Sequence, residues 1–288
     1  MQLFLQQIIN GLLLGGMFAL MSIGLSMIFG IMKTVNFAYG ALYMVGGYAA
    51  YWSAELFGLS LLPALFCAFL IMFAVGAVIE IIGFGQFRGN DDASLIFGLG
   101  LSLILKGGAV LAWGSQNRFI GNNSVPAIEL GPFIVPYARM TAGIASLALI
   151  GLIYLLIART GLGRTFRAVA DNAERAQLLG INPKLINLAV FGFGTAMAAV
   201  ACVLLTPVYS LSPAVDDTAL FTAFTVVILG GLGSIMGCLV AGLILGVIYT
   251  LSFAYLISNI APIVPLLVLI LTLILRPQGL FGQKERLA

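Results

Sequence analysis

Long uncharged apolar runs dominate this sequence and restrict what it can fold into. Residues 8–32 and 185–209 each contain no charged side chain, and about 20 mostly apolar residues are enough for a helix to cross a bilayer. Only 8% of the 288 residues carry charge, against roughly 25% in soluble domains. Because the runs are continuous and do not alternate, they argue against an outer-membrane barrel. The sequence predicts a polytopic membrane protein.

Short polar gaps divide the chain into nine apolar segments. These are 8–32, 37–54, 59–84, 93–114, 139–158, 185–209, 219–233, 235–257 and 261–275. We therefore expect an all-α integral membrane protein with about eight or nine transmembrane segments, in one transmembrane domain over residues 1–288. Segments 37–53 and 218–233 are short and contain glycine pairs, which is typical of broken or re-entrant helices in transporters. The alternative is that both are ordinary kinked helices.

Basic residues indicate the orientation. The stretch 159–184 and the tail with Arg276, Lys284 and Arg286 are the two basic regions, and an excess of Lys and Arg beside spans stays in the cytoplasm. Loop 115–138 is nearly neutral and suits the opposite face. The N-terminus lacks a basic stretch, so we expect the first apolar segment to be retained as a span.

Several chemistries are excluded by composition. The chain has no histidine, and its three cysteines (Cys67, Cys202 and Cys238) are far apart, so a His-based or Cys-His nucleophile and a His-ligated metal are not expected. No G-x-x-x-x-G-K-[ST] motif is present, so this chain does not hydrolyse ATP with a P-loop. We expect no catalytic residue, no metal site and no cofactor.

The basic loop 159–184 contains the pattern of a short helix. Asp171 is a suitable N-cap, and Glu174 completes a capping-box-like pair. Gly180 suits the left-handed position after the last turn, and Pro183 prevents the helix from resuming. Its apolar face comprises Ala173, Ala176 and Leu179. That face docks either on a partner or on the protein's own membrane face.

The same loop carries a family resemblance. The sequence RAVADNAERAQLLGIN (167–182) resembles the cytoplasmic loop of permease subunits of ABC importers, most closely those for branched-chain amino acids. Three further stretches agree: VNFAYGALYMVGGYAA (35–50), RGNDDASLIFGLGLSLIL (88–105) and AFTVVILGGLGSIMGCLVAGLILG (223–246). The chain is most similar to the shorter, H-type permease subunit.

The resemblance implies an ABC-importer permease fold in the bacterial inner membrane, where the charge pattern predicts a cytoplasmic C-terminus. It also implies two ATP-binding cassette ATPase subunits, a second paralogous permease subunit and a periplasmic amino-acid-binding protein as partners, so ATP hydrolysis lies outside this chain. The loop helix would couple the ATPases to the spans. The coupling residues implied are Arg167, Ala170, Asp171, Asn172, Glu174, Arg175, Ala176, Leu179 and Gly180.

Two breaks in the apolar segments are the pathway candidates implied by the resemblance. They contribute Asn36, Tyr39, Gly40, Gly230, Gly231, Gly233 and Ser234. The alternative for the glycines is close helix packing. Small-x3-small faces occur at Gly11–Gly15, Gly233–Gly237 and Gly242–Gly246.

Few charges lie inside the apolar segments, which argues against ion coupling. Lys106 is the exception, and it is either a pathway cation or a side chain that snorkels to the outer interface. We expect import of leucine, isoleucine and valine through an apolar pathway that binds them weakly. The alternatives are a same-fold permease for urea, short amides or another small solute, and a passive channel or ion-coupled carrier.

Overall fold

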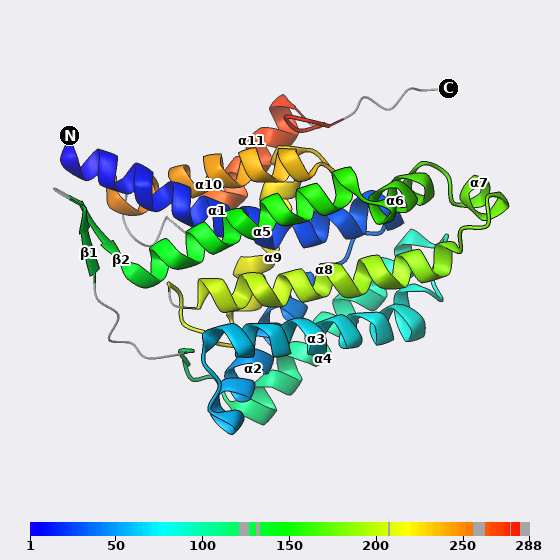
Figure 1. Cartoon of the computed structure of the whole chain (residues 1–288), viewed down its shortest axis with the longest axis horizontal. Coiled ribbons are helices and arrows are strands. Elements are labelled where there is room, and N and C mark those ends of the chain that lie inside the picture. Colours follow the sequence, from blue (N-terminus) through cyan, green and yellow to red (C-terminus); the bar gives the residue numbers. More distant parts are fainter. Residues whose placement is uncertain (121–126, 131–132, 207, 256–262, 277, 283–288) are drawn as a thin grey trace.

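The computed structural model describes residues 1–120, 127–130, 133–206, 208–255, 263–276 and 278–282. Most helices run along one common direction, as a membrane bundle requires (Figure 1). The elements are α1 (Gln2–Met32), α2 (Tyr39–Phe57), α3 (Leu61–Ile79) continued by the π-helix η1 (Glu80–Phe84), α4 (Asp91–Trp113), β1 (Ala127–Leu130), β2 (Phe133–Pro136), α5 (Tyr137–Arg159), α6 (Gly161–Asp171), α7 (Ala173–Leu178), α8 (Pro183–Leu205), α9 (Val215–Gly230), α10 (Ile235–Tyr255) and α11 (Val264–Leu275). The polytopic helical architecture is confirmed.

Each of the nine predicted segments corresponds to a helix, but their lengths differ. Within the described residues, six helices are long and apolar enough to span a membrane: α1, α3 with η1, α4, α5, α8 and α10. Helix α9 has 16 residues and α11 has 12 described residues. In α2 the pair Gly46–Gly47 lies inside an unbroken helix, whereas α9 ends at Gly230. The predicted break is therefore present in one of the two short segments.

Helices α1 and α8 form the centre of the bundle and are the most deeply buried spans. Glycines let α10 approach α1 closely. A Cβ atom on Gly246 would overlap the Cα atom of Gly15, and one on Gly15 would lie 2.7 Å from the carbonyl oxygen of Gly242. Real Cβ contacts are not that short, so a larger side chain would separate the helices. The packing role predicted for these glycines is confirmed.

The basic loop lies at the end of the bundle on the right of Figure 1, and contacts link the described part of the tail to that end. The amide of Leu280 donates to the carbonyl of Leu229 over 2.8 Å, so the tail binds the last turn of α9. A small cavity beside this turn is lined by Gly30, Arg167 and Gly233, which joins α6 to the same end. Lys284 and Arg286 lie outside the described residues.

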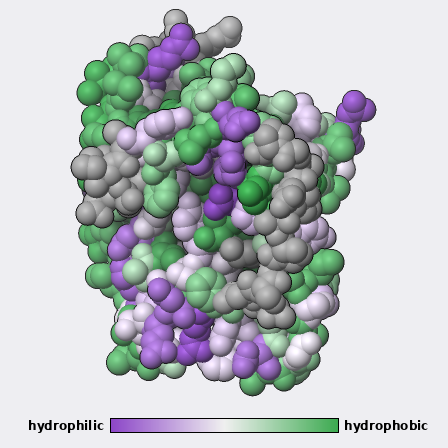
Figure 2. All heavy atoms as spheres, turned by 90° about the vertical axis from the view of Figure 1, so that its left-hand side faces the viewer, coloured by the Kyte–Doolittle hydropathy of each residue, from purple (hydrophilic) through white to green (hydrophobic). Residues whose placement is uncertain are grey.

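The N-terminus and the β-hairpin lie at the opposite end (Figure 1). The side-chain amide of Gln6 donates to the carbonyl of Ile134 in β2 over 2.9 Å. Arg118 and Leu211 exchange backbone hydrogen bonds of 2.8 Å. Figure 2 views this end: hydrophilic residues gather near its middle and lower part, with apolar residues toward the margins. Loop 115–138 thus lies opposite the basic loop, although residues 121–126 and 131–132 are outside the described part.

Candidate functional site

The basic loop folds into two helices joined at Asn172. The side-chain oxygen of Asn172 accepts a hydrogen bond from the amide of Arg175 over 2.9 Å, so Asn172 is the N-cap of α7. The prediction that Asp171 caps this helix is wrong. Asp171 is the last residue of α6, and its helical backbone is incompatible with the extended conformation of an N-cap. Asn172 has that conformation, with φ −160° and ψ 109°.

The other end of α7 closes as a left-handed turn. Gly180 has φ +80°, and the amide of Ile181 donates to the carbonyl of Ala176 over 3.1 Å. The prediction for Gly180 is confirmed. Pro183, however, is the first residue of α8, which Asn182 caps through the amide of Lys184. Pro183 therefore does not prevent a helix from starting there. The backbone amides of the first turn have no partner within the helix, and proline suits this position because it has no amide hydrogen.

The apolar residues of α7 do not all face the same way. Ala176 is 2% exposed, and Ala173 is exposed. Leu178 and Leu179 are 87% and 79% exposed, and α7 projects from the end of the bundle (Figure 1). The protein's own surface therefore covers Ala176 and leaves an exposed leucine pair.

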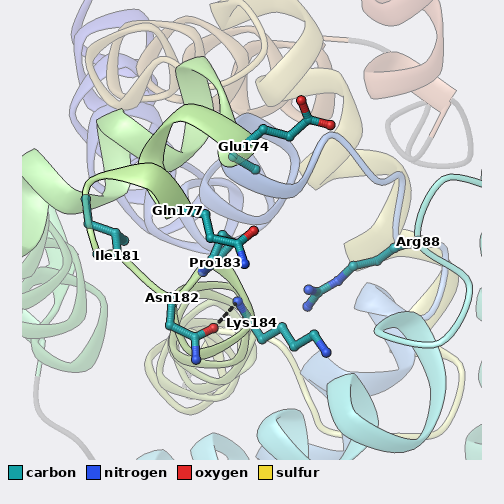
Figure 3. Close-up of a pocket in the computed structure, with 9 residues that line it drawn as sticks. Arg88, Glu174, Gln177, Ile181, Asn182, Pro183 and Lys184 are labelled. Carbon is teal, nitrogen blue, oxygen red and sulfur yellow. Dashed lines mark hydrogen bonds between the residues drawn. The ribbon is translucent and has the colours of Figure 1, made fainter.

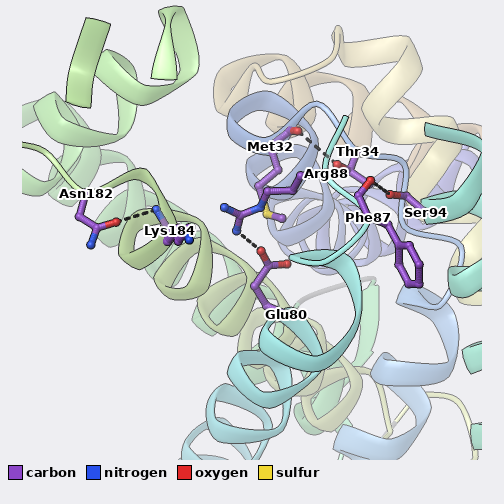
Figure 4. Close-up of polar contacts among 8 residues, drawn as sticks. All are labelled: Met32, Thr34, Glu80, Phe87, Arg88, Ser94, Asn182 and Lys184. Atoms are coloured by element: carbon purple, nitrogen blue, oxygen red, sulfur yellow. Dashed lines mark hydrogen bonds and ion pairs between the residues drawn. The ribbon is translucent and has the colours of Figure 1, made fainter. Parts of the chain in front are cut away.

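A groove of about 560 Å³ lies between α7 and the turn that follows η1. Arg88 and Lys184 point into it from opposite sides (Figure 3). Arg88 also forms an ion pair with Glu80, whose side chain is 2% exposed (Figure 4). Glu174 and Gln177 line the wall formed by α7. The groove thus carries two cationic side chains next to the exposed leucines.

The first group of predicted pathway residues lies where α1, α2 and α9 meet. The side-chain oxygen of Asn36 accepts from the amide of Ala38 over 2.9 Å. The hydroxyl of buried Tyr39 donates to the carbonyl of Met21 over 2.5 Å. A Cβ atom on Gly40 would overlap a backbone oxygen of α9. These contacts join three helices.

The second group forms the turn between α9 and α10. Gly231 and Gly233 have φ angles of +99° and +80°, and the hydroxyl of Ser234 accepts from the amide of Gly237 over 3.0 Å. The carbonyl of Gly230 accepts from the amide of Phe281 over 3.0 Å. The tail thus donates a hydrogen bond to a carbonyl group that has no partner within α9, because the helix ends at this residue. A pathway role for either group stays a prediction.

Lys106 forms ion pairs that the sequence did not reveal. Its Nζ atom is 2.9 Å from Oδ1 of Asp216 and 2.6 Å from Oδ2 of Asp217, both in the first turn of α9. The side chain of Asp216 is 3% exposed and that of Asp217 is 66% exposed. A charged side chain within an apolar segment is expected to have a partner of opposite charge. Asp217 lies 111 residues from Lys106 in sequence, so the sequence alone did not identify this partner. Among the described residues, no group of three or more Cys, Asp or Glu is placed to hold a metal ion.

A family profile and relatives of nearly the same length indicate one family. The sequence profile of the family described as "Branched-chain amino acid transport system / permease component" matches residues 7–273. The permease protein BraD of Pseudomonas aeruginosa, named for high-affinity branched-chain amino acid transport, is 33% identical over 98% of this chain and 97% of its own. LivH of Escherichia coli, of the same description, is 34% identical over 98% and 96%.

One solved structure also aligns. PsaBC from Streptococcus pneumoniae in complex with Fab covers 93% of this chain and 91% of its own, at 12% identity and a TM-score of 0.46, which is too low to establish a shared fold. The family assignment therefore depends on sequence, through a profile that matches nearly the whole chain and relatives at a third identity. The chain belongs to the permease components of branched-chain amino acid transport systems.

Proposed function

We propose that this chain is the transmembrane permease subunit of an ATP-driven ABC importer for branched-chain amino acids in the bacterial inner membrane. The relatives are named for that transport. The observation that carries the ATP-driven part is the exposed leucine pair on α7, at the basic end of the bundle. Because basic loops stay in the cytoplasm, this end and the C-terminus face the compartment that holds ATP.

Helix α7 has the properties of a coupling element. A two-turn helix is marginal alone in water, but Asn172 and Gly180 fix its two ends. Leu178 and Leu179 then present an exposed apolar surface to a partner, on the helix that forms one wall of the groove lined by Arg88, Glu174 and Lys184. The residues we assign to coupling are Arg167, Ala170, Asp171, Asn172, Glu174, Arg175, Ala176, Leu179 and Gly180.

The partners follow from this role. They are two ATPase subunits at the basic end, a second paralogous permease subunit in the membrane and an amino-acid-binding protein at the periplasmic end. Residues 1–288 act as a single permease domain, and the basic loop is part of it. Among the described residues, the charged side chains inside the spans are few and Lys106 is paired with Asp216 and Asp217, which suits solutes with aliphatic side chains, whose selection is left to the binding protein.

The test is a charge placed on the exposed leucines. We expect the double variant Leu178→Glu, Leu179→Glu to lose co-purification with the ATPase subunits and uptake of labelled leucine. Both side chains are exposed, so the amount of protein in the membrane should not change. Leu162→Glu, at an exposed leucine of α6, is the matched control and should keep both properties.

Two outcomes would contradict the proposal. The double variant could bind the ATPases and import leucine at the wild-type rate, which would remove the coupling role of α7. Alternatively, the purified chain alone in liposomes could transport leucine without any ATPase, as a passive channel or an ion-coupled carrier would.

A further inference from the structure

A second cavity lies at the end opposite α7. Its volume is about 320 Å³, near the lower end of the roughly 300–1,000 Å³ of small-molecule sites. Phe18 and Met21 line it from the middle of α1, and Leu205 from the last turn of α8. The cavity thus reaches the depth at which transporters bind their solutes, near the bilayer midplane.

The lining combines apolar carbons with hydroxyl groups. The hydroxyl-bearing residues include Tyr43, Tyr209, Tyr249, Ser212, Thr218 and Thr222. None of the described residues that line the cavity carries a formal charge. The hydroxyl of Thr222 donates to the carbonyl of Thr218 over 2.7 Å, so its oxygen lone pairs stay available to accept. A neutral hydroxyl can both donate and accept, which suits a solute with an ammonium and a carboxylate.

The cavity is open on one side and closed on the other. Tyr209, Ala214 and Thr218 are exposed and lie at its mouth, in and just after the segment that joins α8 to α9. Met21 at its floor is buried, and its carbonyl is bonded to the hydroxyl of Tyr39. The side toward the basic loop is therefore sealed by packed residues, and access is from the end opposite the loop.

We propose that this cavity holds the transported solute between its release by the binding protein and its passage through the membrane. The solute class is a zwitterionic amino acid with a short aliphatic side chain. The floor of Phe18, Met21 and Leu205 takes the side chain, and the hydroxyls bond the charged groups. Partly buried charges without a counter-charge are costly, so binding is weak and release is easy. This inference rests on the proposed function.

The first experiment fills the cavity in the complete transporter. Ala219 is 7% exposed and lines it, so Ala219→Phe should abolish leucine uptake while the ATPase subunits still co-purify. A Cβ atom on Gly107 of α4 would have nothing within 4 Å, so Gly107→Phe adds the same ring outside the cavity and should transport normally. Uptake by Ala219→Phe at the wild-type rate would overturn the inference.

The second experiment measures protection and does not depend on the folding of a bulky variant. Cysteine is introduced by Thr218→Cys or Ala214→Cys, after Cys67, Cys202 and Cys238 are replaced by alanine. Right-side-out vesicles that contain the whole transporter are treated with a membrane-impermeant maleimide. Saturating leucine should slow labelling at both positions at least about threefold.

The control is Ser115→Cys, at an exposed residue outside the cavity, whose labelling should not respond to leucine. Unchanged labelling of both cavity cysteines, in a transporter whose unlabelled wild type imports leucine, would overturn this inference and leave the proposed function intact. If the wild type imports no leucine, the proposed function fails instead. A cavity filled by lipid would block labelling with or without leucine, which also counts against the inference.

Discussion

Removing the charge of Lys106 should destabilise the bundle through Asp216. In the wild type the Nζ atom lies 2.9 Å from Oδ1 of Asp216, whose side chain is 3% exposed. Lys106→Met keeps most of the length of the side chain and removes the cation. The carboxylate of Asp216 then lies between helices without a counter-charge, whereas Asp217, which is 66% exposed, can be solvated.

The magnitude follows from the exposure of the three side chains. Breaking a buried ion pair by removing one partner costs about 3–5 kcal/mol, and an exposed pair contributes about 0.2–1 kcal/mol. Because the side chain of Lys106 is 33% exposed, we expect a loss near the lower bound, about 3 kcal/mol, almost all of it from Asp216. At about 2–4 °C per kcal/mol, the melting temperature should fall by about 6–12 °C.

The assay is thermal unfolding of the purified chain in mild detergent, at one fixed heating rate since such unfolding is often irreversible. Asp216→Asn combined with Lys106→Met should recover most of the loss, because it removes the uncompensated charge. Asp217→Asn alone should shift the transition by no more than about 2–4 °C. The reasoning is refuted if Lys106→Met melts with the wild type, or if the double variant melts no higher than Lys106→Met.

Two further variants test packing and capping. Gly246→Val should lower the melting temperature far more than Gly107→Val, because its added carbon meets the backbone of Gly15 and Gly107 has open space around it; equal shifts would contradict the close packing of α1 and α10. Asn172→Ala should lose the cap of α7, about 1 kcal/mol or fivefold in the helix equilibrium, and reduce leucine uptake while melting is unchanged. Asp171→Ala should leave the cap of α7 intact, because Asp171 is the last residue of α6 and its side chain does not cap α7; a loss of the α7 helix in Asp171→Ala but not in Asn172→Ala would restore Asp171 as the cap.

The spans could be predicted because their signal is local. A run without charge, such as residues 8–32, can satisfy its backbone in lipid only as a helix, and the structure gives α1 over Gln2–Met32. The start of α10 at Ile235 agrees with the predicted segment, since the glycines before it end α9. The small-x3-small spacing likewise predicted close contacts, because a helix places such residues on one face.

Helix α6 shows where local reasoning failed. The basic stretch reads as a loop with one short helix, yet Gly161–Asp171 is helical as well. Its residues form a helix against α5 and α1, and propensity alone carries little of that stabilisation. The missed helix also explains the error at Asp171, because a residue that ends one helix cannot be the extended cap of the next.

Helix α9 shows what sequence could not supply, and its length explains why. At 16 residues and 1.5 Å per residue it is about 24 Å long, shorter than the roughly 30 Å of hydrocarbon. Its ends therefore need polar partners within the bundle. Lys106 holds the first turn through Asp216, and the amides of Leu280 and Phe281 take up the last carbonyls.

Both partners come from segments far away in sequence, so no pattern within 215–230 points to them. They also hold α9 at its two ends, and Thr218 and Thr222 between these ends line the cavity of about 320 Å³ described above. Between its ends α9 packs against α1, α2, α10 and α11, and the hydroxyl of Thr225 donates to the carbonyl of Pro265 over 3.0 Å. Helix α9 thus connects the turn before α10 to the cavity lined by Thr218 and Thr222.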